Sequence, residues 1–126
     1  MEKNPILIVD DEISYLELMK EFLNQEGYTN IITESNPLNV LPLLDRTDID
    51  LILLDIFMPE MDGVEVCRSI RSEPELSEMK VIITTGYPHN PKLDEVVRLG
   101  FTNIFSKPFN LLNFVRDVDK ILGREV

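Results

Sequence analysis

The chain has 126 residues, 44% of them hydrophobic and 28% charged, which is the size and composition of one globular domain, here residues 1–126. Its 23 acidic and 12 basic side chains give a formal net charge of −11, so its surface repels phosphate backbones and we expect no direct nucleic-acid binding. One cysteine excludes a disulfide framework and a cysteine-rich zinc site. No apolar run approaches the roughly 20 residues of a membrane-spanning helix, and the opening residues MEKNPILIVDDE contain no apolar stretch of the length expected for a signal peptide. We therefore expect a cytoplasmic domain that does not insert into membranes.

Five short apolar runs predict β-strands. They are Ile6–Val9, Asn30–Thr33, Leu51–Leu54, Val81–Ile83 and Asn103–Phe105. Three of the five are apolar throughout, as expected of strands buried on both faces of a parallel sheet. Helical patterns occupy residues 12–26, 37–45, 63–72, 92–99 and 109–122. This alternation predicts an α/β fold in which a doubly wound, five-stranded parallel sheet lies between two layers of helices.

The first and last helices carry apolar stripes at helical spacing. In the first helix, Leu16, Met19 and Leu23 share one face, and Gly27 marks the end of the helix. The inward stripe of the last helix is expected to be Leu111, Val115, Val118 and Leu122. Both helices are therefore predicted to pack one face on the sheet.

The residues that follow four of the predicted strands include most of the chemically reactive candidates. They are Asp10 and Asp11 after the first strand, Asp55 after the third, Thr84, Thr85 and Gly86 after the fourth, and Ser106, Lys107 and Pro108 after the fifth. The carboxyl ends of parallel strands meet at one edge, which is where ligands bind in such sheets. We therefore expect three carboxylates, a hydroxyl and an ammonium to lie together.

The chemistry of this set favours phosphoryl transfer to an aspartate. Three close carboxylates repel one another unless a cation lies between them, and a small cluster of hard oxygen ligands suits Mg²⁺. A carboxylate beside bound Mg²⁺ can attack a phosphoryl group, since the metal offsets the charge on the transferring oxygens. Lys107 would add a second positive charge, and Thr85 a hydrogen-bond donor.

Simpler interpretations exist for each residue alone. Asp11 or Glu12 could cap the first helix, Thr85 could be a turn residue, and Lys107 with its proline could form a surface turn. Their joint occurrence at the correct strand ends favours the functional interpretation. The single histidine, His89, is expected to be a solvated loop residue, and Cys67 to pack as a small hydrophobic side chain.

Four motifs in order resemble the receiver domain of two-component response regulators, the CheY-like fold. They are ILIVDDE, LILLDIFMPEMDG, VIITTG and FSKPF, and the resemblance runs from about Lys3 to Leu122. It implies the flavodoxin-like strand order 2-1-3-4-5, for which CheY is a standard example. It also implies a phosphoacceptor signalling domain rather than an enzyme with its own substrate.

The resemblance assigns roles to individual residues. Asp55 corresponds to the aspartate that accepts phosphate from the phosphohistidine of a histidine kinase or histidine phosphotransfer protein. Mg²⁺ would be held by Asp11 directly, by Asp10 mainly through water, by Asp55 and by the backbone carbonyl of Phe57. Self-phosphorylation from small phosphodonors and slow self-dephosphorylation are expected.

Further positions match supporting elements of the family. Thr85 corresponds to the switch hydroxyl, Lys107 to the ammonium that contacts the phosphoryl group, and the backbone of Phe57 and Gly86 to phosphoryl-binding groups. The structural matches are Pro59, which shapes the loop after the third strand, Gly63, where that loop enters a helix, and Pro108, which follows a cis peptide bond.

One position departs from the family pattern. Many receivers have Tyr or Phe three residues before the lysine, and that ring moves inward with the threonine; here the position is Ile104, and Phe105 points to the opposite face of its strand. Readout through a moving ring is therefore not expected. Signalling would instead use the surface formed by the helix at 92–99, the strand at 103–105 and the helix at 109–122, which would bind a downstream effector or form a phosphorylation-favoured homodimer.

Three alternatives remain open at this stage. A haloacid-dehalogenase-like phosphatase would place its nucleophile in an Asp-x-Asp motif after the first strand, where this chain has Asp-Asp-Glu. A flavodoxin-like cofactor binder would need a Ser, Thr or Gly phosphate loop there. A phosphorylation-independent interaction module would usually lack one of the acidic residues, the threonine or the lysine.

Overall fold

The computed structural model describes residues 4–58 and 63–124. Its centre is a parallel five-stranded sheet in the order β2-β1-β3-β4-β5, as predicted. The strands are β1 (Ile6–Val9), β2 (Ile31–Glu34), β3 (Leu51–Asp55), β4 (Val81–Thr85) and β5 (Ile104–Ser106). Every residue of β1, β3 and β4 is buried, because these three strands lie inside the sheet and are covered on both faces.

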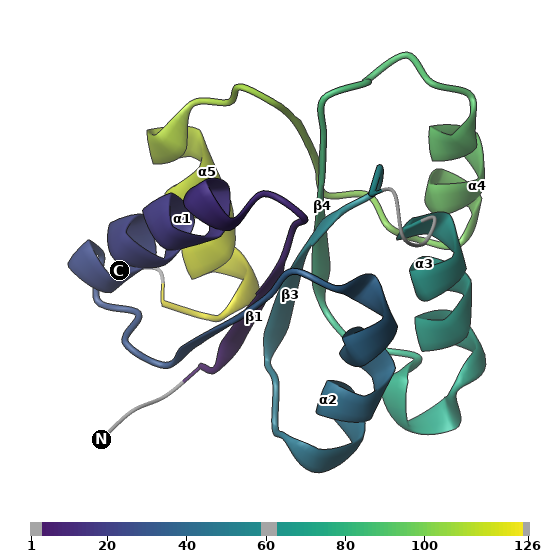
Figure 1. Cartoon of the computed structure of the whole chain (residues 1–126), viewed down its shortest axis with the longest axis horizontal. Coiled ribbons are helices and arrows are strands. Elements are labelled where there is room, and N and C mark those ends of the chain that lie inside the picture. The colour runs from purple at the N-terminus through teal and green to yellow at the C-terminus, as the bar shows by residue number, and fades with distance from the viewer. Residues whose placement is uncertain (1–3, 59–62, 125–126) are drawn as a thin grey trace.

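Helices cover both faces of the sheet (Figure 1). They are α1 (Ile13–Gln25), α2 (Val40–Arg46), α3 (Gly63–Ser72), α4 (Lys92–Arg98) and α5 (Leu111–Ile121). Helices α1 and α5 lie on one face, and α2, α3 and α4 lie on the other, as Figure 1 shows. The three-layer α/β architecture expected from the sequence is confirmed. Within the described parts of the chain, no helix has both the length and the apolar character needed to span a bilayer.

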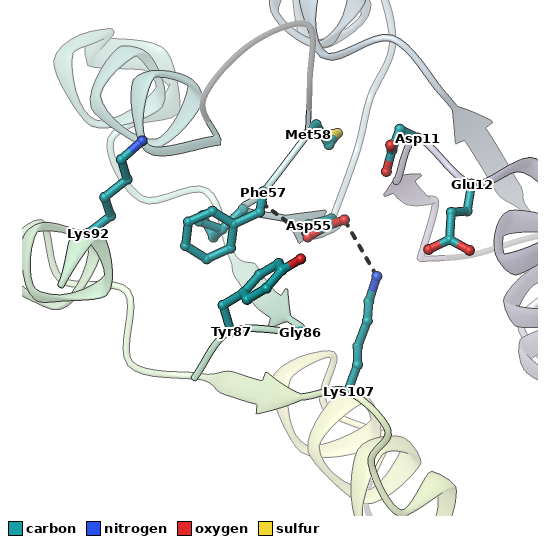
Figure 2. Close-up of a pocket in the computed structure, with 10 residues that line it drawn as sticks. Asp11, Glu12, Asp55, Phe57, Met58, Gly86, Tyr87, Lys92 and Lys107 are labelled. Carbon is teal, nitrogen blue, oxygen red and sulfur yellow. Dashed lines mark hydrogen bonds and ion pairs between the residues drawn. The ribbon is translucent and has the colours of Figure 1, made fainter. Parts of the chain in front are cut away.

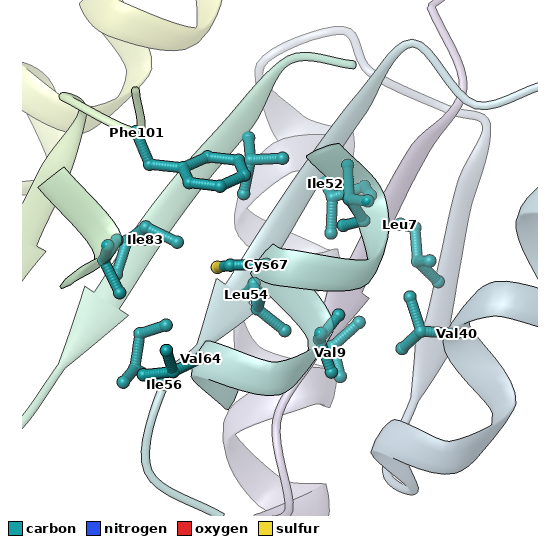
Figure 3. Close-up of a cluster of buried hydrophobic side chains, with 14 of the residues drawn as sticks. Leu7, Val9, Val40, Ile52, Leu54, Ile56, Val64, Cys67, Ile83 and Phe101 are labelled. Carbon is teal, nitrogen blue, oxygen red and sulfur yellow. The ribbon is translucent and has the colours of Figure 1, made fainter. Parts of the chain in front are cut away.

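Two hydrophobic clusters, one on each face, hold the layers together. Alternate residues of a strand enter different clusters, so Leu7 packs towards α2 and α3 whereas Ile8 packs towards α1 and α5. The cluster beneath α3 surrounds Cys67, which is fully buried and packs as a small apolar side chain (Figure 3). The opposite cluster includes Leu16, Met19 and Leu23 from α1, the stripe expected for that helix.

Two local predictions need correction. The segment 37–45 was expected to be one helix, but Pro37–Asn39 is a 3₁₀ turn that precedes α2, because the Asn36 side chain accepts a hydrogen bond from the backbone N–H of Leu38 and tightens the turn. A second 3₁₀ turn, Pro74–Leu76, follows α3 and was not predicted.

The predicted inward-facing stripe of the last helix, α5, is also partly wrong. Leu111 is 41% exposed, whereas Phe114 is fully buried and packs with Val115 and Val118 on the sheet. The reason is the start of the helix: Asn110 caps it by accepting from the backbone N–H of Asn113, so Leu111 lies in the first turn at the edge of the sheet. The buried face of α5 can be predicted correctly only when the residue at which the helix begins is known.

Gly63 brings the beginning of α3 against the segment that follows β3. A Cβ atom at this position would lie 2.6 Å from the backbone of Ile56 and 2.9 Å from the carbonyl oxygen of Asp55. The Gly63 N–H donates to the carbonyl of Ile56 at 2.9 Å. Only glycine permits this approach, which places the helix directly behind the residue that ends β3.

Candidate functional site

Three carboxylates lie at the carboxyl edge of the sheet. Asp10 follows β1, Asp55 ends β3, and Asp11 begins the turn into α1; one oxygen from each lies within 4.8 Å of the others. Asp10 and Asp55 are buried, whereas Asp11 is exposed. The predicted cluster therefore forms, with one carboxylate open to solvent and two inside.

Lys107 brings a single positive charge to this cluster. Its Nζ lies 2.5 Å from a carboxylate oxygen of Asp10. The same nitrogen lies 3.5 Å from a carboxylate oxygen of Asp55 (Figure 2). Lys107 directly follows β5, and its backbone N–H donates to the carbonyl of Thr85 at 2.7 Å, which fixes the start of the side chain beside β4. The next peptide bond, Lys107–Pro108, is cis.

The electrostatics of the site are dominated by burial and by an excess of negative charge. Burial is the largest cause of the rise in the pKa of Asp55 to about 6; the nearby Asp10 adds to the rise, whereas Lys107 and the backbone N–H of Phe57 oppose it. Burial lowers the pKa of Lys107, but its hydrogen bond to Asp10 and the two nearby carboxylates outweigh that effect and hold the pKa above its ordinary value. Within the described residues, the Lys107 ammonium contacts two carboxylates of a three-carboxylate cluster, so the cluster keeps an excess of negative charge that a further cation could neutralise.

Backbone donors orient the two buried carboxylates. Asp10 accepts a hydrogen bond from the N–H of Glu12 at 3.0 Å, and Asp55 accepts one from the N–H of Phe57 at 3.1 Å. Glu12 occupies the N-cap position of α1 without a side-chain capping bond. At the start of α1, the side chain that accepts a hydrogen bond from a backbone N–H, that of Glu12, is therefore Asp10. The simpler interpretation had given a capping role to Asp11 or Glu12.

An open pocket of about 730 Å³ lies over the cluster (Figure 2). Its lining residues are Asp11, Glu12, Asp55, Ile56, Phe57, Met58, Gly86, Tyr87, Lys92 and Lys107. Four lining residues are not predicted from the sequence, because their places at the pocket depend on the paths of the loops: Glu12, Ile56, Met58 and Lys92. The pocket gives a ligand access to Asp55 from solvent.

Thr85 is close to the site but does not line the pocket. It ends β4 next to Thr84, which pairs with Asp55, and its side chain is fully buried. Its hydroxyl oxygen accepts a hydrogen bond from the backbone N–H of Tyr87 at 2.9 Å. Gly86, between these two residues, is exposed and does line the pocket. The hydroxyl is thus coupled to the loop that leads to α4.

Ile104 and Phe105, neighbours in β5, face opposite sides of the sheet. Ile104 packs on the cluster beneath α3 and α4, and Phe105 packs on the other cluster, where its ring centroid lies 5.5 Å from that of Phe114. Ile104 thus occupies the face towards α4 without an aromatic ring. Pro59 lies outside the described residues. His89 is exposed in the loop before α4.

Tyr15 is a further residue of the site that the sequence motifs do not predict. The ammonium of Lys107 lies 4.2 Å from the centroid of the Tyr15 ring. Tyr15 lies in the first turn of α1 and follows Asp11 by four residues. That spacing is the only signal that could have pointed to it.

A family model for the response regulator receiver domain matches residues 6–119. Among curated proteins, the chain is 30% identical over 119 residues to the chemotaxis protein CheY-3 of Vibrio cholerae, covering 94% of this chain and 92% of that protein. It is 35% identical over 120 residues to the sporulation initiation phosphotransferase F of Bacillus subtilis, covering 95% and 94%. It is also 36% identical to the transcriptional regulatory protein CpxR of Escherichia coli, but covers only 50% of that protein.

Solved structures show the same likeness. The signal receiver domain of a DNA-binding response regulator from Colwellia psychrerythraea superimposes with a TM-score of 0.87 at 29% identity, covering 96% of this chain and 99% of that one. The response regulator TrrA of Thermotoga maritima, in complex with Mg²⁺ and BeF, has a TM-score of 0.79 at 32% identity, covering 95% and 100%. The fold, the strand-end cluster and these matches establish that the chain belongs to the response regulator receiver domain family of two-component signalling.

Proposed function

We propose that the chain accepts a phosphoryl group on Asp55 from the phosphohistidine of a histidine kinase or histidine phosphotransfer protein. The observation that carries this proposal is the position of Asp55: its carboxylate ends a buried strand, opens into a pocket, and is within 3.5 Å of the Lys107 ammonium. Membership of the receiver family supports the same role. Asp55 is the nucleophile, and one of its carboxylate oxygens forms the new bond to phosphorus as the bond to the histidine nitrogen breaks.

Asp10, Asp11 and Asp55, with the backbone carbonyl of Phe57, are the residues that would hold Mg²⁺. The fit is supported by the three carboxylate oxygens within 4.8 Å of one another and by their charge, which Lys107 offsets only in part. Bound there, Mg²⁺ supplies positive charge next to the transferring phosphoryl oxygens. TrrA, a relative, has been solved with Mg²⁺ and BeF.

The remaining contacts to the phosphoryl group would come from three elements. Lys107 provides an ammonium from the end of β5, Thr85 a hydroxyl from the end of β4, and the N–H groups of Phe57 and Gly86 provide backbone donors. Lys107 and Gly86 already line the pocket, whereas the Thr85 hydroxyl must turn to reach it. This turn would be the first step of the response.

We further propose that phosphorylation changes the surface formed by α4, β5 and α5, which would bind a downstream effector or a second copy of the chain in the cytoplasm. Three large apolar side chains on these helices are exposed, namely Val97, Leu111 and Leu112. Exposed apolar area of this kind is suited to a protein partner. Residues 1–126 would act as one receiver domain.

The experiment is incubation of the protein with acetyl phosphate and Mg²⁺, followed by intact-mass analysis. We expect a gain of one phosphoryl group that hydroxylamine removes, and no gain in Asp55→Asn. Asp45→Asn, which changes an exposed aspartate on α2, serves as the matched control and should be labelled like the wild type. Failure of the wild type to be labelled would instead favour a phosphorylation-independent interaction module.

A further inference from the structure

The ring of Tyr15 forms one wall of the Lys107 site. Its centroid lies 4.2 Å from the Lys107 ammonium, well inside the range of a cation–π interaction. Tyr15 is half-buried in the first turns of α1 and packs against the cluster beneath that helix. Among residues 4–58 and 63–124, three groups contact the ammonium: the carboxylate of Asp10, the carboxylate of Asp55 and this ring.

We propose that Tyr15 is a positioning residue that holds the Lys107 ammonium over Asp55 during phosphoryl transfer, an inference that rests on the proposed function. A lysine ammonium ends a flexible four-carbon chain, so its position depends on its contacts. Two of the three contacts here are carboxylates that would also hold Mg²⁺. The ring cannot act as a metal ligand, so it is the contact that Lys107 keeps when Asp10 and Asp55 are engaged by the cation.

The aromatic ring of Tyr15, and not its hydroxyl, makes the contact with Lys107. The hydroxyl oxygen is buried and, among the described residues, has no hydrogen-bond partner. Removing a hydroxyl that makes no hydrogen bond costs nothing in lost bonding, so Tyr15→Phe should keep the function. Tyr15→Leu keeps an apolar side chain, although a smaller one, and removes the π face, so it should lose the function.

The experiment compares the rates of phosphorylation by acetyl phosphate in four proteins. Wild type and Tyr15→Phe should react at equal rates, and Tyr15→Leu about three- to tenfold more slowly, the size expected for a lost cation–π contact. Phe22→Leu is the matched control, because Phe22 is an aromatic residue of the same helix that packs on the same cluster. It should react like the wild type. If Tyr15→Leu fails to fold, Tyr15→Met serves as the ring-less variant.

A second measurement is independent of phosphorylation. In the wild type, the ring current of Tyr15 should move the ε-methylene protons of Lys107 upfield of those of the other lysines. The shift should persist in Tyr15→Phe and Phe22→Leu and disappear in Tyr15→Leu. Equal rates for Tyr15→Leu and wild type, a slow Tyr15→Phe, or an unshifted Lys107 signal in the wild type would each overturn the proposal. Absence of labelling in the wild type would instead count against the proposed function, and the Lys107 signal would still test the contact.

Discussion

The rings of Phe57 and Tyr87 meet edge to face at the rim of the acidic pocket, with centroids 5.3 Å apart and planes at 83°. Phe57 follows Asp55 by two residues, and Tyr87 follows Thr85 by two. Figure 2 shows both rings beside Asp55. Tyr87 is 64% exposed, so the pair stands between Asp55 and part of the solvent.

This aromatic pair should make the acyl phosphate long-lived. Hydrolysis needs a water molecule in line with the bond that breaks, and two rings beside the acceptor restrict that approach. Phe57→Asn replaces one ring with a small polar side chain and should shorten the half-life of the phosphorylated protein by about tenfold, equivalent to ~1.4 kcal/mol in the barrier. Tyr87→Phe keeps its ring and should leave the half-life unchanged. A half-life that Phe57→Asn leaves unaltered or lengthens would contradict the shielding argument.

The raised pKa of Asp55 predicts an unusual pH dependence of stability in the absence of metal. With a folded pKa of about 6 against an ordinary value of 3.8, the folded state binds the proton more tightly than the unfolded state. The contribution of Asp55 to stability is therefore fully present below about pH 4 and is lost as pH rises through 6, by on the order of 3 kcal/mol.

Asp55→Asn removes the titrating group and isolates this effect. Its free energy of unfolding, measured by urea denaturation, should rise relative to the wild type between pH 4 and pH 7, and Mg²⁺ should cancel much of the difference by stabilising the wild type. Parallel curves for the two proteins over this range would show that burial does not raise the pKa of Asp55.

Lys107 and Mg²⁺ compete for the same carboxylates. Lys107→Met removes the ammonium from between Asp10 and Asp55, so the two carboxylates attract a divalent cation more strongly. We expect this variant to bind Mg²⁺ about three- to tenfold more tightly at pH 8 by calorimetric titration, yet to be phosphorylated more slowly. Lys80→Met, which changes an exposed lysine, is the control for net charge. Weaker Mg²⁺ binding by Lys107→Met would contradict the competition.

The response to phosphorylation should run through the loop after β4. The Thr85 hydroxyl accepts a hydrogen bond from the N–H of Tyr87, so a reorientation of that hydroxyl acts directly on the backbone of the loop before α4. Ile104 has no ring to move. Hydrogen exchange with and without beryllofluoride should therefore show its largest changes within residues 85–105. In Thr85→Ala, which lacks the hydroxyl, the exchange changes in the loop should be smaller. Exchange changes confined to α1 and α2 in the wild type would show this route to be wrong.

Much of the fold follows from local patterns. The uninterrupted apolar runs of β1, β3 and β4 predict strands buried on both faces, and their acidic or hydroxyl-bearing ends predict the cluster that forms. These predictions succeed because the sheet is parallel, so residues that follow different strands must meet at one edge. The roles of individual residues come from the resemblance to receiver domains, because the spacing of residues alone does not indicate which residue has which role.

What the sequence does not reveal depends on helix starts and on long-range packing. The exposure of Leu111 follows from where Asn110 caps α5, a difference of one or two residues that apolar periodicity does not resolve. The contact of Tyr15 with Lys107 joins residues at opposite ends of the chain. Such a contact requires both the crossing of α1 over the sheet edge and the rotamer of the lysine, neither of which a local pattern records.

The most direct test of the account is to locate the phosphoryl group. The protein is incubated with Mg²⁺ and a phosphohistidine donor or acetyl phosphate, and the acyl phosphate is reduced with borohydride, which converts the modified aspartate to homoserine. The peptide is then sequenced by mass spectrometry. We predict homoserine at position 55 and at no other aspartate, with none when Mg²⁺ is chelated. Homoserine at position 10 or 11, or unchanged labelling in Asp55→Asn, would contradict the assignment of Asp55 as the phosphoacceptor.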